Sequence, residues 1–210
     1  MTMDQRSREE LIVQEYRGIL PYYEAFYIAS IIYSAERSDA AFQRFEAVAQ
    51  NNGEALLAMA TIQEALTHAG ALSRFFWPMQ SKSKVAVARG QSLREAFELD
   101  DTSALKNREL RNAFEHFDER IDEYLMQDHV GYFFPQAMID DHALADDKIG
   151  HIFKLVDPKS GLCVIMGRKF EFRPIHTEVQ CILGLAQKME RNGSRLRLTG
   201  FLDAQATETS

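Results

Sequence analysis

Residues 54–77 read EALLAMATIQEALTHAGALSRFFW, and this stretch decides the fold class. Its apolar side chains return every three or four residues, the spacing that lines one face of an α-helix; they are Leu56, Met59, Ile62, Leu66, Ala69 and Phe76. The alanines and Gly70 leave room for a neighbouring helix to approach closely. Pro78 cannot continue a helix. We therefore predict a long helix that ends at Trp77 and packs against other helices.

Further helices are predicted on both sides of this one. Pro21 suits the first position of a helix, where its missing N–H loses no hydrogen bond. The capping box Ser92-x-x-Glu95 opens a short helix, and the polar, basic residues 79–91 before it are expected to form a loop. The predicted helices span residues 4–18, 21–50 with a break near Ser38-Asp39, 92–99 and 104–127, and a helix fragment with loops is expected over 128–149.

The pattern changes from helical to extended at Gly150. Apolar residues 151–156 and 162–166 flank the turn Asp157-Pro158-Lys159-Ser160-Gly161, which predicts a β-hairpin. Residues 169–173 are a candidate third strand, and Pro174 opens a last helix over 175–191. The predicted fold is therefore mainly α: a helical bundle over 1–149, a small C-terminal β-hairpin with a final helix over 150–193, and a flexible tail over 194–210.

Composition favours a soluble, cytoplasmic protein. The formal net charge is −7, whereas general binders of nucleic acid or membrane surfaces are basic overall. The apolar residues 19–35 are interrupted by Pro21 and Glu24 and fall short of a membrane span. The N-terminal residues MTMDQRSREE lack the apolar core of a signal peptide. The two cysteines, Cys163 and Cys181, are expected to be free and buried.

The predicted helix 104–127 carries the best candidate for chemistry, the segment Arg111-Asn112-Ala113-Phe114-Glu115-His116. A histidine transfers protons near neutral pH, and an arginine offers a planar cation that matches phosphate oxygens. Arg111 and His116 are about 140° apart around a helix, so they flank its polar face. A second copy of the chain across a two-fold axis is then needed to bring one arginine near the other histidine. The alternative interpretation is a solvated face, with Arg111 and Glu115 as a stabilising ion pair.

This pattern resembles the signature of the HEPN superfamily (higher eukaryotes and prokaryotes nucleotide-binding). That signature is an arginine, commonly followed by Asn or another polar residue, and then a histidine, late in a helical bundle; Arg111, Asn112 and His116 fill those positions. The resemblance implies a homodimer with the motif at its interface, and many members are metal-independent endoribonucleases. It also implies that His116 is a general acid or base, that Arg111 stabilises charge on phosphorus oxygens, and that Asn112 holds His116 or a phosphate.

Basic residues precede the motif. Lys82, Lys84, Arg89 and Arg94 occur with no acid between the first and the last, and Arg108 follows further on. If the expected loop folds beside the motif, Lys82, Lys84, Arg89 and Arg108 can contact an RNA backbone. The alternative is an ordinary solvated loop.

No metal or cofactor is predicted. None of the six histidines follows a glutamate by three residues, as the ligand pairs of di-iron bundles do. The acids around Asp140-Asp141-His142 lack the glycine and the spacing of a calcium loop. The predicted function is HEPN-like cleavage or binding of RNA without a metal, at a composite site of a homodimer, and a regulatory protein partner is compatible with it. The alternative is a non-catalytic helical module for protein interaction or dimerisation.

Overall fold

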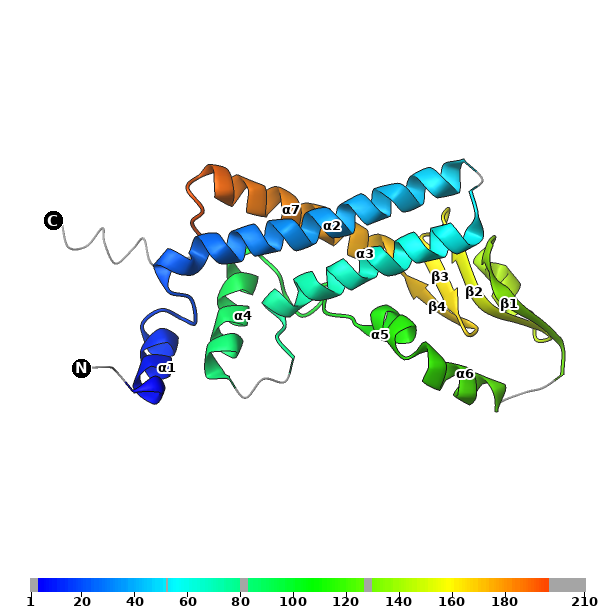
Figure 1. The fold of residues 1–210 in the computed structure, drawn as a ribbon, viewed down its shortest axis with the longest axis horizontal. Helices are drawn as coiled ribbons and strands as arrows, with labels where there is room; N and C mark the ends of the chain where they lie inside the picture. The colour runs from blue at the N-terminus through cyan, green and yellow to red at the C-terminus, as the bar shows by residue number, and fades with distance from the viewer. Residues whose placement is uncertain (1–3, 52, 80–82, 127–129, 197–210) are drawn as a thin grey trace.

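The computed structural model describes residues 4–51, 53–79, 83–126 and 130–196. These residues form mainly helices, with one small sheet at one end of an elongated molecule (Figure 1). In chain order the elements are α1 (Gln5–Gln14), the 3-10 helix η1 (Pro21–Tyr23), α2 (Glu24–Gln50), α3 (Ala55–Phe76), α4 (Lys84–Ala96), α5 (Glu109–Glu115), α6 (Phe117–Leu125), β1 (Tyr132–Ile139), the 3-10 helix η2 (His142–Asp146), β2 (Gly150–Asp157), β3 (Leu162–Ile165), β4 (Arg168–Glu171) and α7 (Arg173–Arg191).

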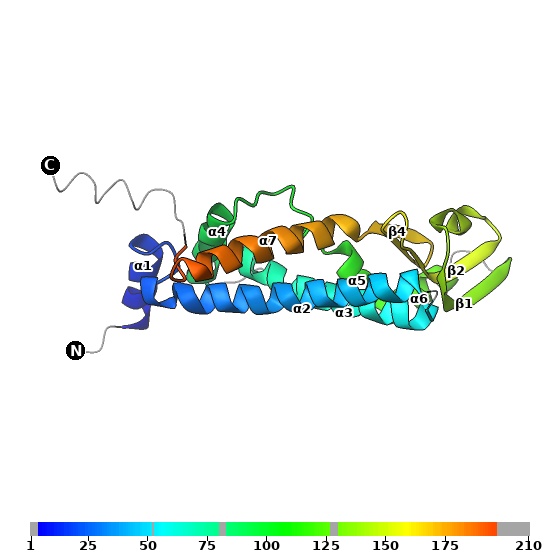
Figure 2. The ribbon, with the colours of Figure 1, turned by 90° about the horizontal axis from the view of Figure 1, so that it is seen from above.

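Two long antiparallel helices, α2 and α3, form the frame of the molecule, and α7 packs along α2 (Figures 1 and 2). The helix predicted over 54–77 is confirmed, because α3 ends at Phe76 just before Pro78. The break predicted near Ser38-Asp39 is wrong. Ser38 is buried inside a continuous α2, and its hydroxyl donates to the carbonyl oxygen of Ala65 in α3 at 2.9 Å. The core between these helices is apolar and fully buried; its largest members are Ile28, Ile31, Phe42, Ile62, Leu72, Phe76 and Ile182.

Helix α4 begins earlier than predicted. Residues 84–91, expected in a loop, form its first half. Ser83 caps the helix instead of Ser92, because its hydroxyl oxygen accepts a hydrogen bond from the backbone N–H of Ala86 at 3.3 Å. Ser92 lies inside the helix and donates its hydroxyl to the carbonyl oxygen of Arg17 at 2.7 Å. The predicted capping box at Ser92 is therefore wrong, and Ser92 instead makes a tertiary contact with the residues that follow α1.

The continuous helix predicted over 104–127 is wrong. Residues 104–108 form turns and irregular backbone, and α5 and α6 are separate helices on either side of His116. His116 has φ −111° and ψ 40°, outside the helical region, although its N–H still bonds to the carbonyl oxygen of Asn112 at 3.0 Å. α5 buries Leu110 and Ala113 against the bundle, whereas no residue of α6 is fully buried. Burial against the bundle thus stabilises α5, whereas α6 lies at the surface of the molecule.

The sheet has the order β1-β2-β3-β4, with β1 parallel to β2 and the other pairs antiparallel. The hairpin, the third strand and the last helix predicted after Gly150 are confirmed. β1 was missed, since 128–149 was expected to be a helix fragment with loops. Its aromatic start, Tyr132 to Phe134, is typical of a strand. Pro135 obscured that signal, and it lies where the pairing with β2 shifts register, a position that tolerates a residue without an N–H.

Bundle and sheet share one hydrophobic cluster. Val156, Cys163, Ile165, Phe170 and Phe172 from the sheet region belong to the same buried cluster as α2, α3 and α7. The division at residue 149 stays a prediction. Of the predicted tail, residues 197–210 lie outside the described part of the chain.

Both cysteines are free, as predicted, but only Cys163 is buried. Burial raises the pKa of the Cys163 thiol to about 12. Cys181 lies exposed on α7, because the inner face of that helix is formed by Val179, Ile182 and Ala186. None of the helices in the described ranges has the length and apolar character needed to cross a bilayer.

Candidate functional site

Arg111 lies against the backbone of α3. Its side chain is only 11% exposed, and a methyl group placed on Gly70 would lie 2.5 Å from the Cδ atom of Arg111. The absence of a side chain at Gly70 therefore lets the arginine stem pass directly over the helix. This placement differs from a freely solvated polar face, because most of Arg111 is inside the protein.

The guanidinium group of Arg111 is incompletely paired. Its Nη2 donates to Oδ1 of Asn112 at 3.1 Å. Its Nε lies 3.3 Å from Oε1 of Glu115, close enough for an ion pair but without the direction of a hydrogen bond. Nε and Nη1 are both buried and have no hydrogen-bond acceptor among the described residues. Unsatisfied buried donors of this kind are rare in native folds and are candidates for a ligand.

His116, in contrast, is open to solvent. Its side chain is 56% exposed because it lies at the break between α5 and α6, and its Nδ1 is 3.5 Å from Oε2 of Glu119. Among the described contacts, no hydrogen bond or ion pair joins the imidazole ring to Arg111 or Asn112. Asn112 thus holds Arg111 and not His116 within one chain. The three motif residues lie in one short segment but form no catalytic pair by themselves.

The predicted RNA-contacting cations are partly engaged in the fold. Arg89 donates Nη2 to the carbonyl oxygen of Arg74 at 3.4 Å, and Arg108 donates Nη2 to the carbonyl oxygen of Trp77. These carbonyls lie at the C-terminal end of α3, where they lack partners within the helix. Lys84 opens α4, and its backbone N–H donates to Oε1 of Glu9 at 3.2 Å. Lys82 lies outside the described residues.

Three arginines lie near one another beside the motif. Burial, followed by the positive charges of Arg111 and Arg74, holds the pKa of Arg108 below its ordinary value. Arg74 was not singled out in the sequence. It follows Gly70 by one turn of α3, but only the fold places that turn beside residues 108–111.

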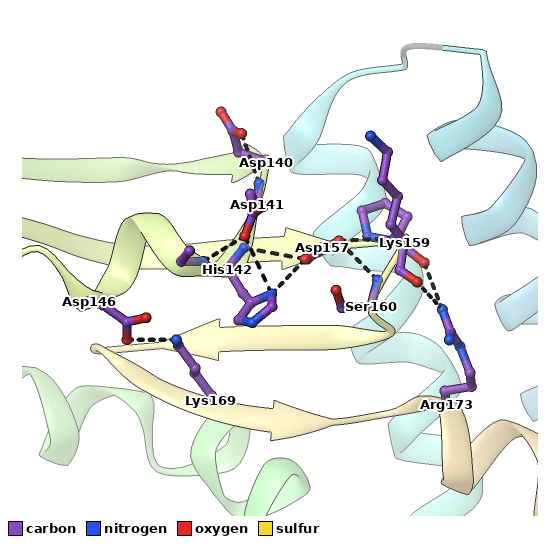
Figure 3. A network of polar contacts seen from close by, with 11 residues as sticks. Asp140, Asp141, His142, Asp146, Asp157, Lys159, Ser160, Lys169 and Arg173 are labelled. Carbon is purple, nitrogen blue, oxygen red and sulfur yellow. Dashed lines mark hydrogen bonds and ion pairs between the residues drawn. The ribbon is translucent and has the colours of Figure 1, made fainter.

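A second polar cluster lies at the sheet end of the molecule (Figure 3). Asp157 ends β2 and is 4% exposed. Its Oδ1 accepts from the backbone N–H groups of Lys159 and Ser160 at 3.0 and 3.1 Å, and its Oδ2 lies 2.7 Å from Nδ1 of His142. Burial alone would raise the pKa of Asp157, but the hydrogen bonds from His142 and Ser160 outweigh it and hold the pKa well below 3.8.

This cluster is also the one group of metal-ligating side chains that the described residues bring together. One ligand atom each from Asp141, His142 and Asp157 lies within 4.8 Å of the others. The sequence analysis set aside the acids near His142 as a metal site, and Asp157, which follows His142 by fifteen positions, joins them only through the sheet. The same carboxylate already serves the β2–β3 turn, so its present partners account for its position.

A cavity of about 810 Å³ adjoins this cluster between the ends of α2, α7 and the β2–β3 turn. Its lining includes Asp157, Lys159 and His176. His176 is 13% exposed, donates or accepts through Nε2 with Oδ1 of Asp39 at 2.9 Å, and stacks on Phe42 with ring centroids 4.4 Å apart. The His176–Asp39 contact ties α7 to α2 and so fixes one wall of the cavity.

We expect Asp157→Asn to lower the free energy of unfolding by about 1–3 kcal/mol at pH 7, because an amide nitrogen cannot accept the hydrogen bonds of His142. The folded pKa of Asp157 is depressed, so its stabilisation is complete above the unfolded value of 3.8 and declines as the pH falls below it. Urea unfolding of both proteins over this range measures the effect. Asp118→Asn on exposed α6 is the control, and an Asp157 variant as stable as wild type at pH 7 would contradict the assignment.

Comparisons of this chain with protein-family models, with curated proteins and with solved structures found no match.

Proposed function

We propose that this chain is a HEPN-like protein that acts on RNA without a metal, as a homodimer with Arg111, Asn112 and His116 at a shared site. The observation that carries the proposal is the state of Arg111. A largely buried guanidinium whose Nε lacks a hydrogen-bond acceptor, and lies 3.3 Å from a half-exposed carboxylate, is prepared to receive an anion on that side.

Glu115 marks where that anion binds. Its side chain is 47% exposed, so it can move into solvent when a phosphate oxygen takes its place beside Nε of Arg111. Glu119 has the same relation to His116, at 3.5 Å and 72% exposed. Both carboxylates compete with RNA phosphates, so binding requires their displacement and is expected to weaken strongly with salt.

The chemistry assigns one task to each motif residue. His116 accepts the proton of the ribose 2′-hydroxyl, whose oxygen attacks the adjacent phosphorus. The bond from phosphorus to the 5′-oxygen breaks, and that oxygen takes a proton from water, which leaves a 2′,3′-cyclic phosphate and a 5′-hydroxyl. His116 then releases the proton it gained to the solvent. Arg111 stabilises the negative charge that builds on the phosphorus oxygens, and Asn112 keeps the guanidinium oriented through its bond to Nη2.

A second copy of the chain is needed to bring an arginine and a histidine of the motif close together. The Arg111 guanidinium is drawn in towards α3, whereas the His116 ring is exposed at the helix break. A two-fold axis beside α5 places the arginine of one copy near the histidine of the other.

We expect the purified protein to cleave single-stranded RNA in the presence of EDTA and to leave 2′,3′-cyclic phosphate ends, since the reaction uses the ribose hydroxyl and protein groups only. Electrophoresis of a labelled oligonucleotide, with and without phosphatase treatment of the ends, measures this. A matched oligonucleotide with 2′-deoxyribose at every position is the control and should stay intact. Cleavage that requires added magnesium or zinc would argue against the proposal.

The second candidate function is a non-catalytic interaction module, and a different surface favours it. β1 is an edge strand whose first residues are exposed, with Tyr132, Phe133 and Phe134 at 71%, 41% and 44%. Exposed aromatic side chains on a free edge are typical of partner-binding surfaces. Absence of both RNA binding and cleavage, together with a dimer that depends on Phe133, would support this function instead.

A further inference from the structure

Helix α3 presents two residues to the motif segment, and neither belongs to the motif. Gly70 seats the stem of Arg111, as described above, and Arg74 follows one helical turn later on the same side of α3. The segment that carries Arg108 and Arg111 runs beside this part of α3, and the Arg108 guanidinium reaches the end of the helix at Trp77. The fold therefore gathers three arginines from two segments that are far apart in sequence.

Acidic side chains compensate only part of this positive charge. Arg111 has Glu115 at ion-pair distance, but neither Arg74 nor Arg108 has a carboxylate within 4.0 Å among the described residues. Burial is the main cause of the lowered pKa of Arg108, and the nearby positive charges of Arg111 and Arg74 lower it further. Repulsion among like charges in a partly buried place is relieved most directly by a bound anion.

The room beside the arginines decides where the anion lies. The gap between α3 and residues 104–111 measures about 20 Å³, which holds a single water molecule and not a phosphate group. Arg74 is exposed and lies one turn of α3 beyond Gly70. An anion that contacts Arg74 therefore binds at the protein surface and not inside this gap.

We propose that Arg74, with Arg108, binds the phosphate group of the RNA backbone that neighbours the phosphate held at Arg111. This inference rests on the proposed function for the identity of the chain that carries the phosphate. Successive phosphates of an extended single strand follow one another along the protein surface, so a strand held at Arg111 reaches the next cations in line. Arg74 is thus a binding residue, and His116 remains the group that moves protons.

The test compares Arg74→Gln with Arg37→Gln in the full-length protein that retains His116. Arg37 is an exposed arginine of α2 that contacts the ring of Tyr33 at 5.3 Å, so its loss removes one positive charge away from the motif. Fluorescence anisotropy with a labelled RNA that carries 2′-deoxyribose at every cleavable position measures binding without turnover. We expect Arg74→Gln to weaken binding about 10-fold and to reduce the slope of log affinity against log salt by about 0.7, the share of one phosphate contact on a single strand.

The outcomes separate this inference from the proposed function. Equal weakening by Arg74→Gln and Arg37→Gln would overturn the phosphate site, even if the protein cleaves RNA. Selective weakening by Arg74→Gln in a protein that does not cleave RNA would support the phosphate site and overturn the catalytic proposal. A wild-type protein that binds no RNA is then tested with inorganic phosphate. Thermal stabilisation that Arg74→Gln alone abolishes would keep the phosphate site and remove RNA as its source, whereas no stabilisation would overturn the phosphate site as well.

Discussion

His116→Ala is expected to lower the rate of RNA cleavage by about 10²–10⁴-fold, the usual contribution of a general acid or base. The fold should be unaffected, because the His116 ring is 56% exposed and Glu119, its ion-pair partner among the described residues, is 72% exposed. Surface changes of this kind shift the free energy of unfolding by no more than about 0.5 kcal/mol. Single-turnover cleavage of a labelled RNA, together with urea unfolding, measures the two effects.

Arg111 needs a more careful substitution than His116. Because its stem packs over Gly70, Arg111→Ala would remove buried contacts as well as charge. Arg111→Lys keeps an apolar stem and the charge but loses the planar, two-pronged geometry that matches a phosphate. We expect it to reduce cleavage by about 10²–10³-fold, with thermal stability close to that of wild type. A rate unchanged by Arg111→Lys would mean that only the charge at this position matters.

Mixed dimers test the shared site. If each site takes its arginine from one chain and its histidine from the other, a dimer of one Arg111→Lys chain and one His116→Ala chain keeps one intact site. An equimolar mixture, after exchange of subunits, then regains about a quarter of wild-type activity, because half of the dimers are mixed and each has one of two sites intact. Sedimentation of the wild type must show a dimer. A mixture as inactive as its parents would exclude the crossed arrangement.

The sequence predicted the elements that neighbouring residues determine, and it missed the features that depend on contacts between distant parts of the chain. Helix α3 was found from the helical spacing of its apolar residues, and the hairpin around Asp157-Pro158 was found from its turn residues. The start of α4 was missed because Ser92 looked like a cap, whereas it donates to Arg17, far away in the chain. The break at His116 was missed because helix projection assumes a straight helix, and nothing in the sequence says where packing against the bundle stops.

The candidate site shows the same division. The sequence singled out Arg111, Asn112 and His116 from their spacing, but it placed Arg111 on the polar face of a helix and did not predict its burial. The burial of Arg111 depends on Gly70, which is 41 positions earlier. No pattern in the sequence predicts that these two residues are in contact. Arg74 and Asp157 were missed for a related reason, since each belongs to a polar cluster whose other members lie on a different element of the fold.

Phe42→Ala is expected to lower the free energy of unfolding by about 3–5 kcal/mol, the cost of emptying a buried aromatic site. Phe42 is 1% exposed in the middle of α2. Its ring stacks on His176 of α7 and lies 6.2 Å, centroid to centroid, from Phe172, which follows β4. One side chain of the bundle thus supports both the last helix and the exit from the sheet. Phe26→Ala is the matched control, because Phe26 belongs to the same helix and is 67% exposed.

The same variant tests whether residues 150–193 form a separate unit. Because Val156, Cys163 and Phe172 are buried in the cluster that includes Phe42, loss of the Phe42 ring should destabilise bundle and sheet together. Native-state hydrogen exchange resolves this residue by residue. We expect the slowest amides of α2 and of the β2–β3 pair to exchange faster by the same factor. Amides of β2 and β3 that keep their wild-type rates while those of α2 accelerate would instead establish the boundary at residue 149, with a sheet that is stable without the bundle.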